Sequence, residues 1–375
     1  LADTIHANPE IAFEEYESSA LLSRTLEENG FAVERGVAGL DTAFVATTEG
    51  QGGGPTVAFL AEYDALPGLG HACGHNLIGA ASIGAGLAVQ TILPELAGTL
   101  QVIGTPAEEG GGGKGTMVDG GVFAEVDAAM MFHPSYHNMT RRRSLASYKI
   151  FIEFYGKPAH AGARPDEGIN ALEALILTYN GINALRQHLR DDARIHGVIT
   201  HGGDAPNIVP KYAAARFYVR AADTPYCSEV FDKVRACAEG AALATGSGLS
   251  FTEYAPRYDA MMPNPVLASV VEENMAALGI EVKAPEADER MGSTDMGNVS
   301  QVVPAVHPYI SIGSEEIGGH TAEFEVASGS PAGHEGMLKA AKMLAMTGVD
   351  LLTDPAKLSQ AQRAFQAQKA EQEST

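Results

Sequence analysis

The sequence predicts an α/β fold in which a mainly parallel sheet, with helices on both faces, is interrupted by a smaller α+β insertion. Three observations support this prediction: a length of 375 residues, an alternation of strand-like and helix-like runs, and a change of pattern after residue 143. A chain of this length exceeds the usual size of one domain. Its hydrophobic content of 45% is ordinary for a globular protein.

The first part of the chain alternates helices with buried strands. Residues 10–30 space apolar side chains at helical intervals and end at Gly30, while residues 77–93 form an apolar helix rich in small residues. Apolar runs that end in polar residues predict strands at 56–68, 99–113 and 128–135. In such sheets the chemistry collects where the strands end, so polar side chains at those points are candidates for a site.

The insertion has a different pattern. Residues 147–156 alternate as a half-exposed strand does. A helix, two strands, a helix and a strand then follow, at 168–190, 195–202, 213–222, 226–245 and 249–254. This order is typical of a ferredoxin-like unit.

The two predicted domains follow from these patterns. We predict a discontinuous domain over residues 1–144 and 259–375, and an inserted domain over 145–258. A long helix at 331–352 closes the first domain, and the polar tail at 357–375 is expected to fray.

Charge and cysteine usage narrow the class of protein. The chain has 47 Asp and Glu against 25 Lys and Arg, a formal charge of −22, which disfavours nucleic acid and anionic membranes as partners. Three loosely spaced cysteines, Cys73, Cys227 and Cys237, indicate reduced thiols and a cytoplasmic protein. No run approaches 18 uninterrupted apolar residues.

Several residues that can ligate a metal lie at or near strand ends. Glu108 and Glu109 follow one strand and His133 ends another, while Cys73 and His75 share one loop. His320 lies in the segment GGHTAEF. Zinc accepts S, N and O ligands of these kinds. Adjacent glutamates fit such a site if one ligates and the other takes a proton from water.

The same residues allow other functions to be compared. A phosphate-binding loop at 108–116 is excluded because Lys114 is followed by Gly115 rather than Ser or Thr. A thiol hydrolase built on Cys73 stays open, although neighbours on one tight turn rarely reach attack geometry. A binding protein that keeps only the fold is a third possibility.

Six segments together resemble one known family, the M20 metallopeptidases. They are AEYDALPGLGHACGHN, GTPAEEGGGGK, MFHP, GKPAHAG, NIVP and GSTDMGNVS followed by GGHTAEF. They occur in the family's order over nearly the whole chain and are most similar to its amidohydrolase branch, subfamily D, of the aminobenzoyl-glutamate hydrolase type. The resemblance implies a zinc-peptidase-like catalytic domain with a smaller inserted lid or dimerisation domain.

The resemblance also implies roles in the catalytic domain. Glu108 would be the general base and acid, and Asp64 would orient a ligand. The ligands of two divalent metal ions, most simply Zn with Mn, Co or Ni as alternatives, would be Cys73, His75, Glu109, His133 and His320.

In the insertion, the resemblance implies four further residues. His160 would reach the active site of a partner subunit and stabilise the oxyanion, which requires at least a homodimer. Asn207 and Arg220, with Arg257, would bind the substrate, an N-acyl amino acid or a small dipeptide whose amide bond is hydrolysed.

One residue departs from the pattern of many subfamily members. Those members read CGHD, whereas this chain reads CGHN with Asn76. An amide carries no charge, so we expect one negative charge fewer near the metal ions and a weaker second site.

Overall fold

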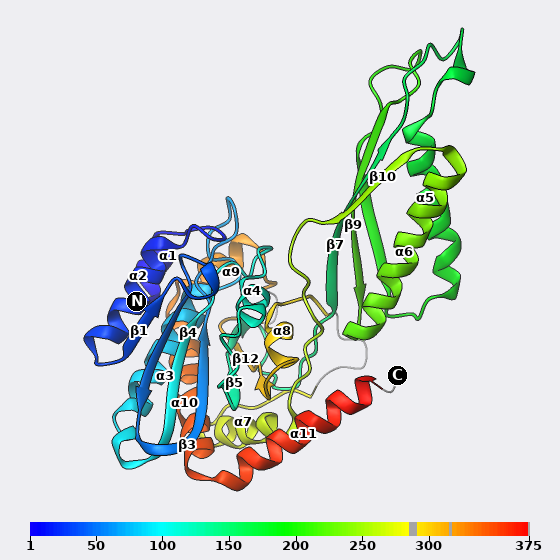
Figure 1. The fold of residues 1–375 in the computed structure, drawn as a ribbon. Coiled ribbons are helices and arrows are strands. Elements are labelled where there is room, and N and C mark those ends of the chain that lie inside the picture. The colour runs from blue at the N-terminus through cyan, green and yellow to red at the C-terminus, as the bar shows by residue number, and fades with distance from the viewer. Residues whose placement is uncertain (285–290, 315–316, 374–375) are drawn as a thin grey trace. The chain divides into compact units, whose positions relative to one another are not determined.

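The computed structural model describes residues 1–284, 291–314 and 317–373, which divide into two compact units (Figure 1). The first unit comprises residues 1–143 and 261–375, and the second comprises residues 144–260. Each unit has its own hydrophobic core. Among the described residues, no helix combines the length and apolar character needed to cross a bilayer.

A six-stranded sheet forms the centre of the first unit. Its order is β1 (Ala32–Arg35), β2 (Phe44–Glu49), β4 (Ala97–Gly104), β3 (Gln51–Ala61), β5 (Ala128–Met130) and β11 (Ala305–Val306). The pairs β3–β4, β3–β5 and β5–β11 are parallel, whereas β1–β2 and β2–β4 are antiparallel. A separate parallel pair joins β6 (His133–Ser135) to β12 (Tyr309–Ser311).

Helices surround this sheet. They are α1 (Ala2–Ala7), α2 (Tyr16–Glu28), α3 (His75–Gln90), α4 (Gly113–Asp119), α7 (Pro265–Ala277), α8 (Met296–Ser300), α9 (Ala322–Ser328), α10 (Pro331–Thr353) and α11 (Pro355–Glu373). Helices α3 and α10 pack on each other and on β3. A Cβ on Gly79 of α3 would lie 3.0 Å from the carbonyl oxygen of Glu62, so this glycine permits the close approach of helix and strand.

The second unit has the order β7 (Ala146–Tyr155), α5 (Ala171–Leu185), β8 (Arg194–His201), β9 (Tyr212–Ala221), α6 (Thr224–Thr245) and β10 (Gly248–Glu253). Its sheet has the antiparallel order β10-β7-β9-β8. This is the predicted ferredoxin-like arrangement. The α/β fold class with a smaller α+β unit is therefore confirmed.

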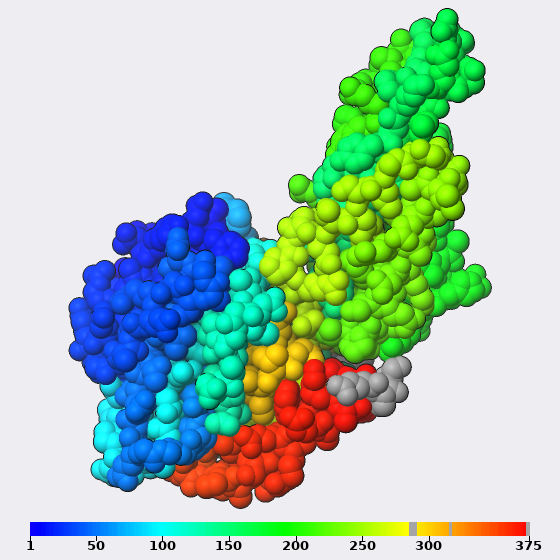
Figure 2. All heavy atoms as spheres, in the orientation of Figure 1, coloured from blue at the N-terminus to red at the C-terminus, as the bar shows by residue number. Residues whose placement is uncertain are grey.

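Two expectations about local structure are wrong. The run at 128–135 is not one strand, because β5 pairs with β3 and β11 whereas β6 pairs with β12. The tail does not fray as predicted: α11 lies against α7 and α10 on the surface of the first unit (Figure 2). It buries Leu358, Ala361 and Phe365, whose spacing of three and four residues is that of one helix face.

Candidate metal centre

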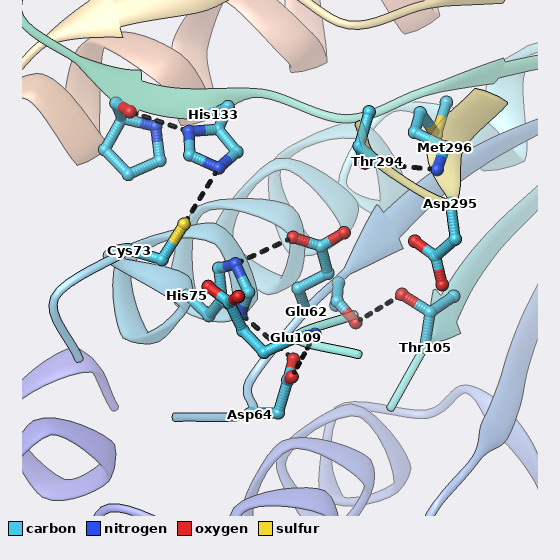
Figure 3. Close-up of polar contacts among 12 residues, drawn as sticks. Glu62, Asp64, Cys73, His75, Thr105, Glu109, His133, Thr294, Asp295 and Met296 are labelled. Carbon is cyan, nitrogen blue, oxygen red and sulfur yellow. Dashed lines mark hydrogen bonds and ion pairs between the residues drawn. The ribbon is translucent and has the colours of Figure 1, made fainter. Parts of the chain in front are cut away.

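The predicted strand ends do come together in the first unit (Figure 3). Asp64 follows β3, Glu108 and Glu109 follow β4, and His133 begins β6. Figure 3 shows Cys73, His75, Glu109 and His133 grouped around one region. The described residues contain three overlapping ligand sets: Cys73–His75–His133, Cys73–Glu109–His320 and His75–Glu108–Glu109, each with its ligand atoms within 4.8 Å of one another.

His75 is fixed by a carboxylate. Its Nδ1 lies 2.9 Å from Oδ1 of Asp64, and the other oxygen of Asp64 accepts a 2.8 Å hydrogen bond from the backbone N–H of Glu109. Burial opposes ionisation of Asp64, but His75 and this backbone bond hold its pKa below the usual value. Because Nδ1 is engaged, Nε2 is the nitrogen left for an ion, an arrangement common in metal sites.

His133 is fixed in the same way by its own backbone. Its Nδ1 donates to the carbonyl oxygen of Pro134 at 2.7 Å, and its Nε2 lies 3.4 Å from Sγ of Cys73. Burial, with the nearby His75, lowers the pKa of His133 to about 3, so the ring is neutral and its Nε2 lone pair faces the sulfur.

Burial also argues against Cys73 as a nucleophile. It raises the pKa of the Cys73 thiol well above the ordinary value, and the charge of Glu109 adds to this rise. A nucleophilic cysteine requires a lowered pKa. The thiol-hydrolase alternative therefore loses support.

His320 completes the cluster from a strained backbone position. Its φ is +62°, and its backbone N–H donates to the carbonyl oxygen of Ala72 at 2.9 Å, which ties it to the Cys73 loop. Its Nε2 lies 3.3 Å from Oε1 of Glu109, and the interaction with Glu109 raises the pKa of His320. A non-glycine residue at positive φ is uncommon and often marks a functional position.

These spacings fit the size of a tetrahedral ion. Ligand atoms at about 2.1 Å from one zinc ion, at tetrahedral angles, are about 3.4 Å apart. The Cys73–His133 and Glu109–His320 pairs lie at 3.4 and 3.3 Å. The donor set and its geometry therefore fit divalent metal ions.

Glu108 is a buried carboxyl beside these ligands. Its side chain is nearly enclosed, and burial raises its pKa well above the usual value, with Glu62, Glu109 and Asp295 contributing. A carboxyl with a raised pKa is suited to accepting and returning a proton near neutrality.

Gly74 sets the approach of two ligand-bearing segments. It has φ +76°, and a Cβ at this position would lie 2.5 Å from Cγ of Pro134. Any larger residue would push the loop that carries Cys73 and His75 away from Pro134, whose carbonyl fixes His133. The glycine is therefore required on grounds of both conformation and space.

Asn76 lies outside all three ligand sets. Its buried amide donates to the carbonyl oxygen of Ser328 at 3.1 Å and is 3.5 Å from that of Ala2. The amide thus links α3 to two other segments. The sequence led us to expect one negative charge fewer near the metal ions, but the uncharged Asn76 side chain lies in a packing contact between segments.

A buried charge cluster near His75 is not predicted by the sequence patterns. Glu62, Lys114 and Asp295 are fully buried, and the Lys114 ammonium contacts both carboxylates. The sequence raises Lys114 only as a phosphate-binding lysine. The available signal was Glu62 itself, a charged residue two positions before Asp64 at the end of an otherwise apolar strand.

In the second unit, two predicted residues lie together at one end of the sheet. The exposed His160 accepts hydrogen bonds at Nδ1 from the backbone N–H groups of Gly162 and Ala163, at 3.2 and 3.1 Å. Because Nδ1 accepts, Nε2 is the ring nitrogen that can donate. The backbone N–H of Ala161 donates to the carbonyl oxygen of Asn207 at 2.9 Å, so the two loops are joined.

The predicted arginines lie at the opposite end of the same sheet. Arg220 pairs with Ser147 across the β9–β7 ladder, and Ser147 in turn bridges to Tyr258, next to Arg257. The His160 loop reaches the sheet where Lys211 pairs with Gly156. Because Tyr212 and Arg220 are eight positions apart along β9, the two ends are about 25 Å apart at the usual strand rise.

Arg257 is engaged within its own unit. Its Nε and Nη2 contact the two carboxylate oxygens of Glu253 at 2.6 and 2.8 Å, and its guanidinium lies over the ring of Tyr148. Its predicted contact with substrate would require it to leave this bidentate pair.

Comparison with known proteins shows the family to which this chain belongs. The chain is 39% identical to the Xaa-Arg dipeptidase of Mus musculus, over 100% of this chain and 90% of that protein. It is 32% identical to one component of the p-aminobenzoyl-glutamate hydrolase of Escherichia coli K12, over 98% and 91% of the two chains. A dinuclear metal-binding peptidase of Bacillus subtilis shares the fold, with a TM-score of 0.70, 23% identity and coverage of 94% and 96%. The description of peptidase family M20/M25/M40 matches residues 58–345, and the chain belongs to this family.

Proposed function

We propose that this protein is a metal-dependent hydrolase that cleaves the amide bond of N-acyl amino acids or small dipeptides. The named relatives act on an Xaa-Arg dipeptide and on p-aminobenzoyl-glutamate. Both substrates have an amide bond to an amino acid that carries a free carboxylate. The observation that carries the proposal is the ligand cluster, in which His75 and His133 each have Nδ1 engaged, while Nε2 of His75 has no hydrogen-bond partner among the described residues and Nε2 of His133 faces Sγ of Cys73.

Five residues would hold two divalent ions: Cys73, His75, Glu109, His133 and His320. The mixed S, N and O donors favour zinc, with Mn, Co and Ni as alternatives. When bound, the ions would polarise the scissile carbonyl and acidify the attacking water.

Glu108 is the proposed general base and acid. It would take the proton of the attacking water and deliver it to the leaving amine. Its nearness to Glu109 and His75 supports different roles for the two glutamates: Glu109 would ligate the ion and Glu108 would transfer the proton. Asp64 would keep His75 oriented for its ion.

The second unit would supply the substrate contacts from its two ends. His160 offers an Nε2–H donor for the developing oxyanion, and Asn207 would bind the substrate beside it. Arg220 would clamp the substrate carboxylate, because a guanidinium binds carboxylates in a bidentate way. Arg257 remains a weaker candidate for this clamp because Glu253 already occupies it.

The separation of these ends supports a homodimer. A dipeptide is far shorter than about 25 Å, a span equal to roughly eight strand residues. Therefore His160 and Arg220 of the same chain would not meet one substrate. We propose that each site takes Arg220 from one subunit and His160 with Asn207 from its partner.

One surface of the second unit suits such an assembly. Strand β8 is the last strand of its sheet and exposes Val198 and Ile199 by 60% and 42%. Within residues 144–260, which are all described, its outer edge pairs with no strand. A second copy of β8 would pair with this edge, which could otherwise pair with unrelated strands.

The free thiols of Cys73, Cys227 and Cys237 fit the proposed cytoplasmic location.

A hydrolysis screen tests the function directly. Metal-stripped protein would be reconstituted with Zn²⁺, Mn²⁺, Co²⁺ or Ni²⁺ and assayed on Xaa-Arg dipeptides, other dipeptides, aminobenzoyl-glutamate and N-acyl amino acids. We expect turnover only after a metal is restored, and loss of turnover with a chelator. Activity that survives complete metal removal would refute the proposal and revive a metal-free mechanism.

A further inference from the structure

A buried ammonium near the metal centre is bound by two carboxylates in different ways. Nζ of Lys114, on α4, lies 2.5 Å from Oε1 of Glu62 and 2.7 Å from Oδ1 of Asp295. The second oxygen of Asp295 accepts a 3.0 Å hydrogen bond from the backbone N–H of Lys114. Both oxygens of Asp295 are thus used on Lys114, whereas Glu62 uses only one.

The second oxygen of Glu62 faces His75. Oε2 lies 3.4 Å from Nε2 of His75, and neither atom makes a hydrogen bond within the described part of the chain (Figure 3). Nε2 is the nitrogen that the Asp64 contact leaves for an ion. A separation of 3.4 Å exceeds the usual N–H···O bond of 2.7–3.2 Å, and matches two donors that share one tetrahedral ion, about 3.4 Å apart.

Such an open oxygen is costly in the protein interior. Glu62, Lys114 and Asp295 are all fully buried. The two carboxylates hold the pKa of Lys114 above its usual value, so the ammonium stays charged and keeps Glu62 in place. A carboxylate oxygen without a donor is unfavourable in such a place unless a cation compensates it.

We propose that Glu62 is a further carboxylate of the metal centre, facing the ion held by His75, and that Lys114 and Asp295 are positioning residues that hold it there. This inference rests on the proposed metal-dependent function. Glu62 supplies a negative charge close to the ion, at the side of His75 away from Asp64.

The test measures metal binding rather than turnover. The full chain would be stripped of metal and titrated with Zn²⁺ against a chelating dye, as wild type and as Glu62→Gln. Glutamine keeps the shape and an acceptor for Lys114 but removes the charge. We expect about 10- to 100-fold weaker binding of one ion, the usual effect of losing a supporting group. The thermal midpoint of the metal-free protein should stay close to that of wild type.

Asp295→Asn is the matched comparison. Like Glu62→Gln, it removes one negative charge beside the Lys114 ammonium. The charge is removed, however, from a carboxylate whose oxygens both face Lys114. We expect it to weaken zinc binding less than Glu62→Gln does. An equal loss in both variants would show that only the net charge of the cluster matters, and would overturn the facing role of Glu62.

The remaining outcomes also decide the matter. Wild-type affinity in a folded Glu62→Gln protein overturns this inference and leaves the proposed function intact. If Glu62→Gln does not fold, Glu62→Asp keeps the charge but withdraws the oxygen from His75; weaker binding then supports the proposal, and wild-type binding overturns it. A wild-type chain that binds no metal overturns both proposals.

Discussion

The two units hold their candidate functional residues in opposite ways. In the first unit, residues from separate segments converge on one cluster that is largely buried, with His320 exposed at its edge, and the groups that orient His75 and His133 lie in the same unit. In the second, His160 and Asn207 are exposed at one end of a sheet whose other end holds Arg220. The first unit brings its ligand-type residues together by itself, whereas the contacts that we propose for the second unit would require a second copy of the chain.

This difference separates two kinds of requirement. The ligand cluster depends on the interior of a single chain, so a change there should affect every molecule regardless of assembly. The contacts that we propose for the second unit would depend on association, so a different chain could repair their loss. Mixing and substitution experiments can therefore distinguish the two units.

The largest effect is expected inside the buried cluster. Glu108→Gln should lower kcat by about 10²–10⁴, because the proton of the attacking water loses its acceptor. Zinc stoichiometry measured on the same sample should stay at the wild-type value. The exposed Glu125→Gln is the matched control and should keep wild-type kcat. A Glu108→Gln enzyme with most of its turnover and normal metal content would contradict the assignment.

His160 tests the idea of shared sites. His160→Ala should lower kcat by about 10²–10³ through loss of an oxyanion donor. Mixing it with Glu108→Gln, after dissociation and reassociation, should restore activity to about a quarter of wild type, because half of the dimers are hybrids with one intact site. No recovery, with hybrid dimers shown to have formed, would place His160 in its own chain's site.

A smaller effect is expected at the other end of that sheet. Arg220→Ala should lower kcat/KM by about 10- to 100-fold, the worth of a charge-assisted contact, mainly through a higher KM. Arg216→Ala, on the same strand, is the matched control and should change little. Steady-state kinetics on a dipeptide and on its C-terminal amide would check this, since the amide lacks the carboxylate. Equal losses on both substrates would argue against a clamp.

The smallest effect concerns Asn76. Asn76→Asp removes the donor to the Ser328 carbonyl and buries a carboxyl, so stability should fall by about 1–3 kcal/mol. Chemical unfolding of the metal-free protein would measure this. If the substituted chain instead bound zinc more tightly at unchanged stability, the charge expected at this position would belong to the metal centre after all.

Much of the fold could be predicted because periodicity is local. The second half of β7 alternates between buried and more exposed residues as its sequence pattern predicts, although its first five residues are all buried, and the helical spacing of α10 agrees with its pattern. The split of 128–135 into two strands could not be predicted, because pairing with β11 and β12 depends on segments more than 170 residues away. The prediction that the tail frays is wrong because it rests on the polar composition of the tail, whereas Leu358, Ala361 and Phe365 lie on one buried helix face.

The site could be predicted where a motif carried the chemistry, and not where packing did. Cys73, His75 and Glu109 stand in segments rich in ligands, and the structure brings them together. Asp295 meets Lys114 only through the tertiary fold, across 181 positions of the chain. The opposite placement of His160 and Arg220 also depends on the direction of β9 in its sheet.

The absence of a side chain at Gly74 limits the size of the ion that the cluster would accept. It fixes how near the Cys73–His75 loop can come to Pro134, and hence to His133. An alanine there would spread the sulfur and nitrogen donors without altering any of them. The affinity for a small ion would fall more than the affinity for a larger ion, so the larger ion would be favoured. If the cluster holds the proposed metal ions, their choice would therefore depend partly on the absence of a side chain at Gly74.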